Sequence, residues 1–257
     1  MIFFIRRLSL IAIIAAIVVV PLSCSKGGSS KKLVKKGLFQ CEERLQTAAH
    51  RMERRGFNDA IRILEEIKYQ CGGIPLMDTV YYYTGMSHFR LRQYENARFE
   101  FEILYREFPR SPFVEEAHFR IAHMRYIQSL PSFRDQTDTK EAIRLLLDYL
   151  DLFPRGNFSD SAKAMYASAL NKLAEKEFNN ARFYRRQRKH EAALIYYRAV
   201  LSDYPESKFV PEAIVGMAEM LMALGRTQDA QEVVEELDTE AFEERLKTRI
   251  NAVKRML

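Results

Sequence analysis

Residues 78–109 read DTVYYYTGMSHFRLRQYENARFEFEILYREFP, and this stretch decides the fold. Its apolar residues recur at three- and four-residue spacing, which is the period of an amphipathic α-helix. Gly85 and Ala97 are small enough to lie where two antiparallel helices cross closely, and the aromatic side chains beside them can fill the remaining space. Pro109 ends the second helix, because proline lacks an N–H and clashes with the preceding turn. The stretch therefore predicts a pair of antiparallel helices.

This pair resembles a tetratricopeptide repeat. The residues that carry the resemblance are Tyr81, Gly85, Phe89, Tyr94, Ala97, Phe101, Leu104 and Pro109. The small residue of the second helix recurs along the chain at Ala60, Ala97, Ala142, Ala193 and Ala230. Stacked repeats bury one continuous core. We therefore expect an all-α, tetratricopeptide-like α-solenoid of about five helix pairs plus a C-terminal helix from about Glu240, occupying residues 38–257.

The spacing of the repeats is irregular. Successive alanine anchors are 37, 45, 51 and 37 residues apart, whereas a uniform tetratricopeptide array repeats every ~34 residues. The third unit carries an insertion at residues 130–138, and the fourth begins with a long helix at roughly residues 160–188. These two features set the chain apart from a regular array.

The positive charge of the chain belongs to its N-terminal segment. The formal net charge is +6, yet residues 1–37 hold seven basic and no acidic residues, and residues 38–257 hold 33 basic and 34 acidic ones. A nucleic-acid-binding domain carries its basic excess on the fold itself. We therefore expect no nucleic-acid partner.

The N-terminus resembles the signal of a bacterial lipoprotein. A basic start precedes an apolar run at residues 8–20, and Cys24 follows shortly afterwards. The run is shorter than the roughly 20 residues of a membrane span. We expect a lipoprotein signal peptide at residues 1–23, lipidation of Cys24, including palmitate, and a flexible basic tether at residues 24–37. Pro21 departs from the usual lipobox pattern.

Two other interpretations of this segment stay open, an uncleaved membrane anchor and a plain secretory signal. Ser25, rather than aspartate, follows Cys24. This resembles the sorting rule that sends lipoproteins to the outer membrane. We therefore expect a lipid-anchored protein of the outer membrane that faces the periplasm.

The sequence contains no catalytic constellation. Its five histidines are His50, His88, His118, His123 and His190. His118 and His123 are five residues apart, so they do not share a helix face as a zinc-binding pair does. No Gly-rich phosphate loop or Cys-x-x-Cys motif is present. We expect no enzyme, no metal and no cofactor.

Cys41 and Cys71 are candidates for a disulfide. They lie near the start of the first predicted helix and at the end of the second, and these ends are neighbours in an antiparallel pair. An exported chain meets an oxidising compartment in many bacteria. The bridge would close a loop of about 30 residues and stabilise the fold by a few kcal/mol. Two buried thiols are the alternative.

Projection of the repeat positions places seven side chains on a concave groove built from the first helices of the pairs. They are Tyr82, Met86, Phe89, Arg90, Phe119, His123 and Tyr126. Aromatic side chains with a cation nearby suit a peptide that has aromatic residues and a terminal carboxylate. The alternative is that several of them pack between repeats, because a register error of one residue exchanges groove for core.

The densest basic run of the fold consists of Arg182, Arg185, Arg186, Arg188 and Lys189. One interpretation is a docking surface for an acidic partner domain, and another is an ordinary solvated face. A third is internal pairing with the Glu-rich stretch at residues 232–244.

Two stretches resemble the BamD family, the lipoproteins of the outer-membrane β-barrel assembly machinery. They are Pro131-Ser132-Phe133-Arg134-Asp135-Gln136, followed by Thr139, Ala142 and Phe153-Pro154, and Leu173-Ala174-Glu175-Lys176-Glu177, followed by Ala181, Tyr184, Arg188, Ala192-Ala193 and Tyr204-Pro205-Glu206-Ser207. The resemblance covers about residues 38–237 and includes the lipoprotein signal. Cys71-Gly72-Gly73 departs from the usual Tyr-Pro. Tyr196 stands where many members carry an arginine that meets the barrel protein, so that contact is not carried over.

The resemblance implies a non-enzymatic scaffold. Its later repeats would bind the POTRA domains of a BamA-like barrel protein, and its early repeats would recognise the C-termini of unfolded outer-membrane proteins for membrane insertion. Other lipoproteins of the assembly machinery would be further partners. The alternative is a different periplasmic tetratricopeptide lipoprotein, for pilus assembly or envelope division, in which a regular period of ~34 residues would be expected.

Overall fold

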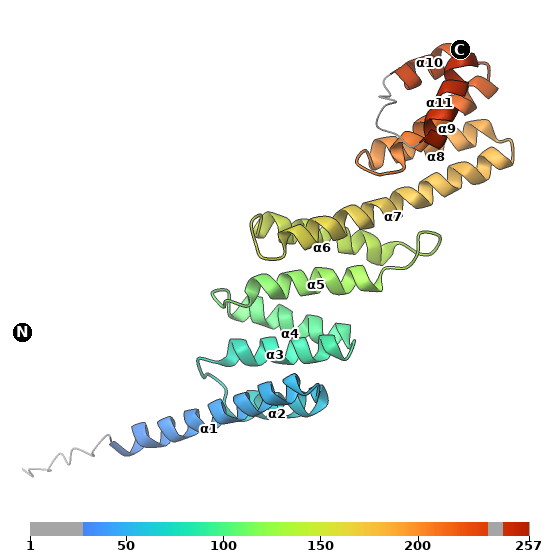
Figure 1. The fold of residues 1–257 in the computed structure, drawn as a ribbon. Coiled ribbons are helices and arrows are strands. Elements are labelled where there is room, and N and C mark those ends of the chain that lie inside the picture. Colours follow the sequence, from blue (N-terminus) through green and yellow to red (C-terminus); the bar gives the residue numbers. More distant parts are fainter. Residues whose placement is uncertain (1–27, 236–243, 257) are drawn as a thin grey trace, which may run out of the picture.

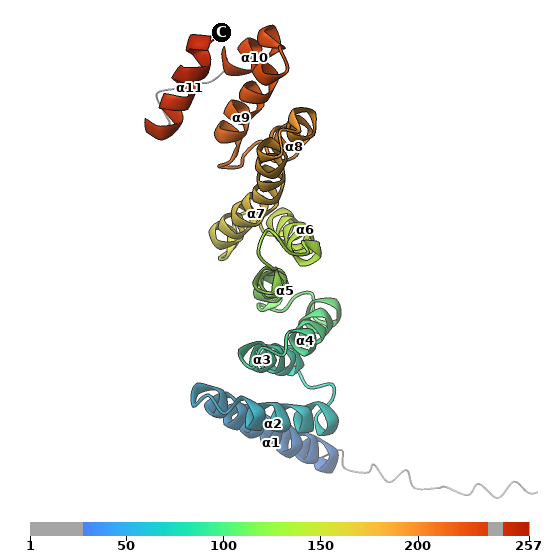
Figure 2. The same cartoon turned by 90° about the vertical axis from the view of Figure 1, so that its right-hand side faces the viewer.

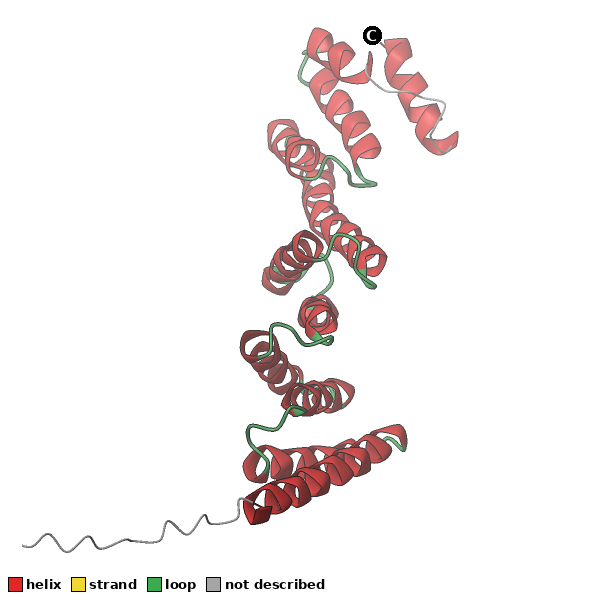
Figure 3. Cartoon of the chain, turned by 90° about the vertical axis from the view of Figure 1, so that its left-hand side faces the viewer, coloured by secondary structure: helices red, strands yellow, loops and turns green. Residues whose placement is uncertain are grey.

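The computed structural model describes residues 28–235 and 244–256 of the 257-residue chain. Within these ranges the backbone forms eleven helices and no strand, which confirms the all-α expectation (Figure 1, Figure 3). The helices are α1 (Gly28–Glu53), α2 (Phe57–Gln70), α3 (Met77–Arg90), α4 (Tyr94–Glu107), α5 (Val114–Gln128), α6 (Thr137–Leu152), α7 (Ser159–Arg186), α8 (His190–Asp203), α9 (Val210–Ala223), α10 (Thr227–Glu235) and α11 (Glu244–Met256).

Successive helices pair antiparallel, and the pairs stack into an elongated solenoid (Figure 1). The five pairs from α1–α2 to α9–α10 are followed by α11, which packs on α9. Figure 2 shows the same stack with its right-hand edge toward the viewer. The longest helix of the second half, α7, has 28 residues and packs on α6 and on α8. This confirms the expected architecture of five helix pairs and a C-terminal helix.

The recurring small residues lie where the helices cross, as the sequence predicted. The five anchors Ala60, Ala97, Ala142, Ala193 and Ala230 are all completely buried. Gly85 of α3 permits a still closer approach, because a Cβ atom there would lie 2.7 Å from the ring of Phe101 on α4. The helices of a pair therefore meet through backbone and ring, and neighbouring pairs extend the same core along the stack.

Short connections join the two helices within four of the five pairs. Arg55, Arg92, Arg188 and Gly225 adopt the left-handed conformation there, with φ of 61°, 60°, 56° and 75°. Residues other than glycine rarely adopt this backbone conformation, so arginine at three of these four turns is unusual. On the solenoid these connections lie along one edge, at the right of Figure 1.

The third pair replaces the short connection with the predicted insertion. Gln136 is buried at its centre. The side-chain amide of Gln136 donates a hydrogen bond to the carbonyl of Pro131 at 2.7 Å, and its oxygen accepts one from the hydroxyl of Thr139 at 2.8 Å. One polar side chain thus satisfies the backbone of the loop and ties it to the start of α6.

The first helix begins inside the segment predicted as a tether. The predicted signal peptide, Cys24 and residues 24–27 lie outside the described residues. From Gly28 onward the backbone is helical, ahead of the predicted domain start at residue 38. Four of residues 31–36 are lysines, and lysine has a high helix propensity, so this segment can extend a helix that is fixed by packing further along.

Candidate peptide groove and docking surface

A cleft of about 660 Å³ opens between the end of α1, the start of α2 and one face of α3. Its lining consists of Met52, Glu53, Arg55, Phe57, Tyr82, Tyr83, Met86 and Arg90. Three of the seven predicted groove residues, Tyr82, Met86 and Arg90, therefore lie together. We call this cleft the N-terminal groove.

Tyr82 forms a fixed wall of the N-terminal groove. Its ring stacks on Phe113, with centroids 4.2 Å apart and planes 9° apart. Its hydroxyl donates a hydrogen bond to the carboxylate of Glu116 at 2.6 Å. Burial, together with this carboxylate, raises the pKa of Tyr82, so the phenol keeps its proton. A ring held in this way is preorganised for packing against a ligand.

Two guanidinium groups lie at the rim of the groove. Arg55 and Arg90 are exposed, and neither forms an ion pair with another residue in the ranges that the structure describes. Glu53, the acidic residue of the lining, lies 3.4 Å from a ring nitrogen of His50 instead. Free guanidinium groups beside apolar and aromatic walls can bind a carboxylate that is attached to an apolar side chain.

Phe89, Phe119 and His123 pack between repeats rather than line this cleft. Phe119 is only 3% exposed and stacks on Phe158, with centroids 4.6 Å apart. His123 lies between the rings of Phe119 and Phe89, at 5.6 and 5.8 Å. Because α5 is covered by α4, α6 and α7, its aromatic face is interior. For Phe119 the structure therefore corrects the groove assignment in favour of the packing alternative.

His123 and Tyr126 take different positions on α5. The Nδ1 atom of His123 has no hydrogen-bond partner within the described residues, and burial, followed by the charge of Arg120, lowers the pKa of this imidazole. Tyr126 donates a hydrogen bond to the hydroxyl of Ser168 on α7 at 2.9 Å. Neither side chain reaches the N-terminal groove.

The groove has a side that the sequence analysis missed. Met52 belongs to α1, Arg55 to the turn after it and Phe57 to α2. The groove residues predicted from the sequence all came from the second and third pairs. A signal was present, because Phe57 is the first residue of α2 just as Tyr94 is the first residue of α4, and Tyr94 packs against the core that α4 shares with α5.

The basic run divides into paired and unpaired residues. Arg185 and Arg249 both donate to Glu219, at 2.8 Å each, so Arg185 pairs with α9 rather than with the 232–244 stretch, of which residues 236–243 lie outside the described ranges. Arg182 lies with its guanidinium carbon 5.9 Å from the ring centroid of Phe178. The remaining three, Arg186, Arg188 and Lys189, are exposed and form no ion pair in the described part of the chain.

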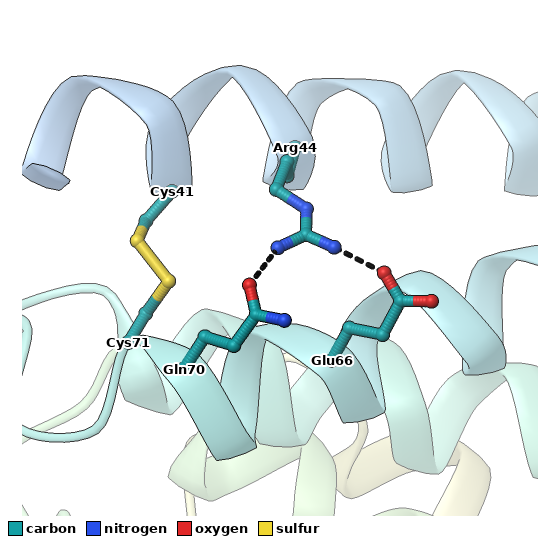
Figure 4. Close-up of a disulfide and its surroundings, with 5 residues drawn as sticks. All are labelled: Cys41, Arg44, Glu66, Gln70 and Cys71. Atoms are coloured by element: carbon teal, nitrogen blue, oxygen red, sulfur yellow. Dashed lines mark hydrogen bonds and ion pairs between the residues drawn. A yellow bond between two sulfur atoms is a disulfide. The ribbon is translucent and has the colours of Figure 1, made fainter.

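Cys41 and Cys71 are joined by a disulfide in the structure (Figure 4). It links α1 to the end of α2, at the opposite end of the pair from the Arg55 turn. Next to it, Arg44 donates hydrogen bonds to Gln70, at 2.5 Å, and to Glu66. Both cysteines are buried. The disulfide and Arg44 together clamp α1 onto α2.

No group of three or more His, Cys, Asp or Glu residues is arranged to hold a metal ion in the described ranges. Within residues 28–235 and 244–256, no helix has the length and apolar character of a membrane span.

The sequence matches a family of outer membrane lipoproteins. The sequence model of the YfiO family, described as an outer membrane lipoprotein, matches residues 40–237. The outer membrane protein assembly factor BamD of Caulobacter vibrioides is 25% identical over 223 residues, which are 85% of this chain and 72% of that protein.

Two solved structures align with most of this chain at low identity. A TPR repeats protein from Bacteroides fragilis is 10% identical with a TM-score of 0.48, over 84% of this chain and 99% of that one. MamA from Desulfovibrio magneticus is 14% identical with a TM-score of 0.37, over 84% and 96%. Since the YfiO model spans most of the chain, and the BamD relative confirms the resemblance seen in the sequence, the chain belongs to the YfiO family of outer membrane lipoproteins.

Proposed function

We propose that this protein is a non-enzymatic scaffold of the β-barrel assembly machinery, anchored in the outer membrane by a lipid on Cys24 and facing the periplasm. The observation that carries the proposal is the match of residues 40–237 to the outer membrane lipoprotein family. The name of the Caulobacter relative, an assembly factor for outer membrane proteins, supports the role in assembly. In this proposal residues 1–23 are a cleaved signal peptide and residues 38–257 are the repeat domain.

The N-terminal groove is proposed to bind the C-termini of unfolded outer-membrane proteins. Its aromatic and apolar walls, Tyr82, Met86 and Phe57, match an apolar terminal side chain, and the guanidinium groups of Arg55 and Arg90 match the terminal carboxylate. A groove of about 660 Å³ has room for two or three side chains of a peptide.

The exposed residues Arg186, Arg188 and Lys189 are proposed to dock the POTRA domains of a BamA-like barrel protein. They follow Arg185, which pairs with Glu219, and they are exposed without an ion pair in the described ranges, so their charges are not neutralised there. Charge complementarity would speed the association and orient the partner.

Affinity purification from outer membranes in mild detergent tests this function. A barrel protein with POTRA domains should co-purify with the wild-type chain. Its recovery should fall when Arg186, Arg188 and Lys189 are changed to Gln. As a control, changing three exposed basic residues elsewhere to Gln should leave the recovery at the wild-type level. These are Arg110, Arg155 and Arg198. Recovery of pilus or division proteins in place of the barrel protein would establish the alternative function.

The Cys24→Ser variant tests the anchor. Without the lipid the protein should leave the outer-membrane fraction or accumulate as precursor. Retention at normal levels would mean that partner proteins, not a lipid, hold it at the membrane.

A further inference from the structure

The two long edges of the solenoid carry different charges. Each edge is made of helix ends together with the connections that follow them. On the edge formed by connections within pairs, the last four residues of the helix and the connection after it have formal net charges of +2, +2, +1, +4 and +1 for α1, α3, α5, α7 and α9. On the edge formed by connections between pairs, the same count for α2, α4, α6 and α8 gives +1, +1, 0 and −1. We call the first of these the basic edge.

Helix electrostatics do not explain this difference. Basic residues are favoured at helix C-termini because the helix dipole is negative there. Both edges contain C-terminal ends, those of the first helices on the basic edge and those of the second helices on the other. A preference for C-termini would enrich both edges equally.

The charges of the basic edge are available to a partner. Nine of its residues are exposed and form no ion pair within the described ranges, in contrast to the paired arginines on the helix faces such as Arg98 and Arg144. They are Arg51, Arg54, Arg55, Arg90, Arg92, Arg134, Arg186, Arg188 and Lys189. They belong to helix ends and connections from the first pair to the fourth, and these connections lie along one side of the elongated stack (Figure 1).

We propose that the basic edge binds an acidic, extended polypeptide segment that runs along several repeats. A row of exposed guanidinium groups that spans several pairs matches a chain of carboxylates along its length, whereas the apolar walls of the N-terminal groove adjoin only Arg55 and Arg90. The proposal goes beyond the N-terminal groove, because Arg51, Arg54 and Arg92 do not line that groove. At Arg186, Arg188 and Lys189 the edge coincides with the surface proposed above for a POTRA domain, so there the two partners would compete.

The placement of the edge favours a polypeptide over anionic lipid headgroups. The chain enters α1 at the opposite edge (Figure 1), and α1 has 26 residues, which is about 39 Å of helix. If Cys24 carries the lipid, as proposed above, the basic edge begins at the far end of α1 from the membrane anchor. This step alone rests on the proposed anchor, and the experiment below includes a lipid arm for that reason.

The test uses the full chain in a neutral detergent and a fluorescent 24-residue peptide of Glu, Gly and Ser, acetylated and amidated at its ends. Extended, the peptide spans about 80 Å. It lacks the terminal carboxylate and the apolar side chain that are proposed for ligands of the N-terminal groove. The edge variant below leaves the groove residues Arg55 and Arg90 unchanged, so its loss of binding reports on the rest of the edge. Anisotropy at low salt should show binding that weakens steeply as salt is added.

Two matched variants separate the edge from net charge. The edge variant carries Arg51→Gln, Arg54→Gln, Arg92→Gly, Arg186→Gln and Arg188→Gly, with glycine at the two positions of positive φ. The control variant removes five exposed charges elsewhere, with Arg110, Arg155, Lys163, Arg198 and Lys208 all changed to Gln. Each exposed ion pair contributes a factor of about 1.5 to 5 in affinity, so the edge variant should bind roughly tenfold more weakly or worse, and the control within about twofold of wild type.

Several outcomes would overturn the proposal. Equal loss in both variants would mean that the peptide responds to net charge alone. Absence of peptide binding would remove the edge as a docking surface. Binding to phosphatidylglycerol vesicles without binding to the peptide would assign the edge to lipid. Circular dichroism of both variants must show the wild-type helix content and melting temperature, and if the edge variant alone unfolds, the single variants Arg54→Gln and Arg186→Gln, each expected to weaken binding about twofold, decide the matter.

Discussion

Removal of the Cys41–Cys71 disulfide should loosen the first helix pair and leave the rest of the solenoid as it is. The bridge spans 30 residues, and the chain-entropy relation for a loop of that length gives about 3.6 kcal/mol at 25 °C. The completely buried Leu64 and Ile67 and the clamp by Arg44 remain. The pair should therefore stay folded but open far more often, by up to about 400-fold in the population of the open state.

Hydrogen exchange measures this opening helix by helix. In a Cys41→Ser/Cys71→Ser variant the amides of α1 should lose protection, whereas those of α7 to α9 should not, because a repeat contacts only its neighbours. Wild type treated with dithiothreitol should behave like the variant. The affinity of the N-terminal groove for peptides should also fall, because α1 supplies Met52 and Glu53 to its lining.

Two results would refute this reasoning. Unchanged protection of α1 would mean that packing alone holds the pair. Titration of two thiols from Cys41 and Cys71 in the denatured, unreduced wild type would mean that no bridge exists.

Four further predictions follow from individual side chains. Arg90→Ala should weaken a peptide with a free C-terminal carboxylate by about tenfold and its amidated form hardly at all, as measured by calorimetry; equal loss would remove Arg90 from the site. Gly85→Ala should cost about 1–3 kcal/mol in urea unfolding because its Cβ meets the Phe101 ring, whereas Gly72→Ala, with ordinary contacts, should cost far less. Burial lowers the pKa of His118, so its contribution to stability is complete above pH ~6.5 and is lost as the pH falls below it; His118→Phe should flatten the dependence of the melting temperature on pH between 7.5 and 5, and an unchanged slope would contradict this. Arg92→Gly should raise the free energy of unfolding by about 0.5 kcal/mol, because glycine adopts positive φ without strain; a loss of stability would show that the arginine side chain holds the turn.

The helix crossings were predictable because they depend on residue size at a fixed spacing. A backbone that approaches another backbone excludes any large side chain, so the alanines from Ala60 to Ala230 mark the pairs whatever lies around them. The insertion was equally visible as a break in that spacing. Its internal support by Gln136 was not, since a buried amide that bonds three carbonyl groups has no sequence pattern of its own.

The groove was only partly predictable because its members depend on which neighbouring helices cover each face. Phe119 and Tyr82 occupy similar positions on first helices, yet α5 is enclosed by three helices and α3 leaves one face open beside α1. One signal was available and unused: Tyr82–Glu116 and Arg185–Glu219 both join first helices of adjacent pairs, and each spans 34 residues. This spacing is a signal rather than a rule, because Tyr149 and Glu115 are also 34 residues apart and lie within one pair.

The choice of residues at the left-handed turns connects stability to the proposed basic edge. A residue with a Cβ atom costs about 1 kcal/mol in this conformation, which glycine avoids, and Gly225 shows that glycine serves at one of these turns in this fold. The chain nevertheless has arginine at 55, 92 and 188, and all three side chains are exposed. Neither the turn geometry nor an ion pair within the described chain explains the arginines. The feature that arginine adds over glycine at these turns is its exposed guanidinium group. Three such turns cost about 3 kcal/mol together, which is less than the stabilisation of about 3.6 kcal/mol from the disulfide. Each of them places an exposed guanidinium group on the edge, in the first, second and fourth pairs, where an acidic chain can meet it.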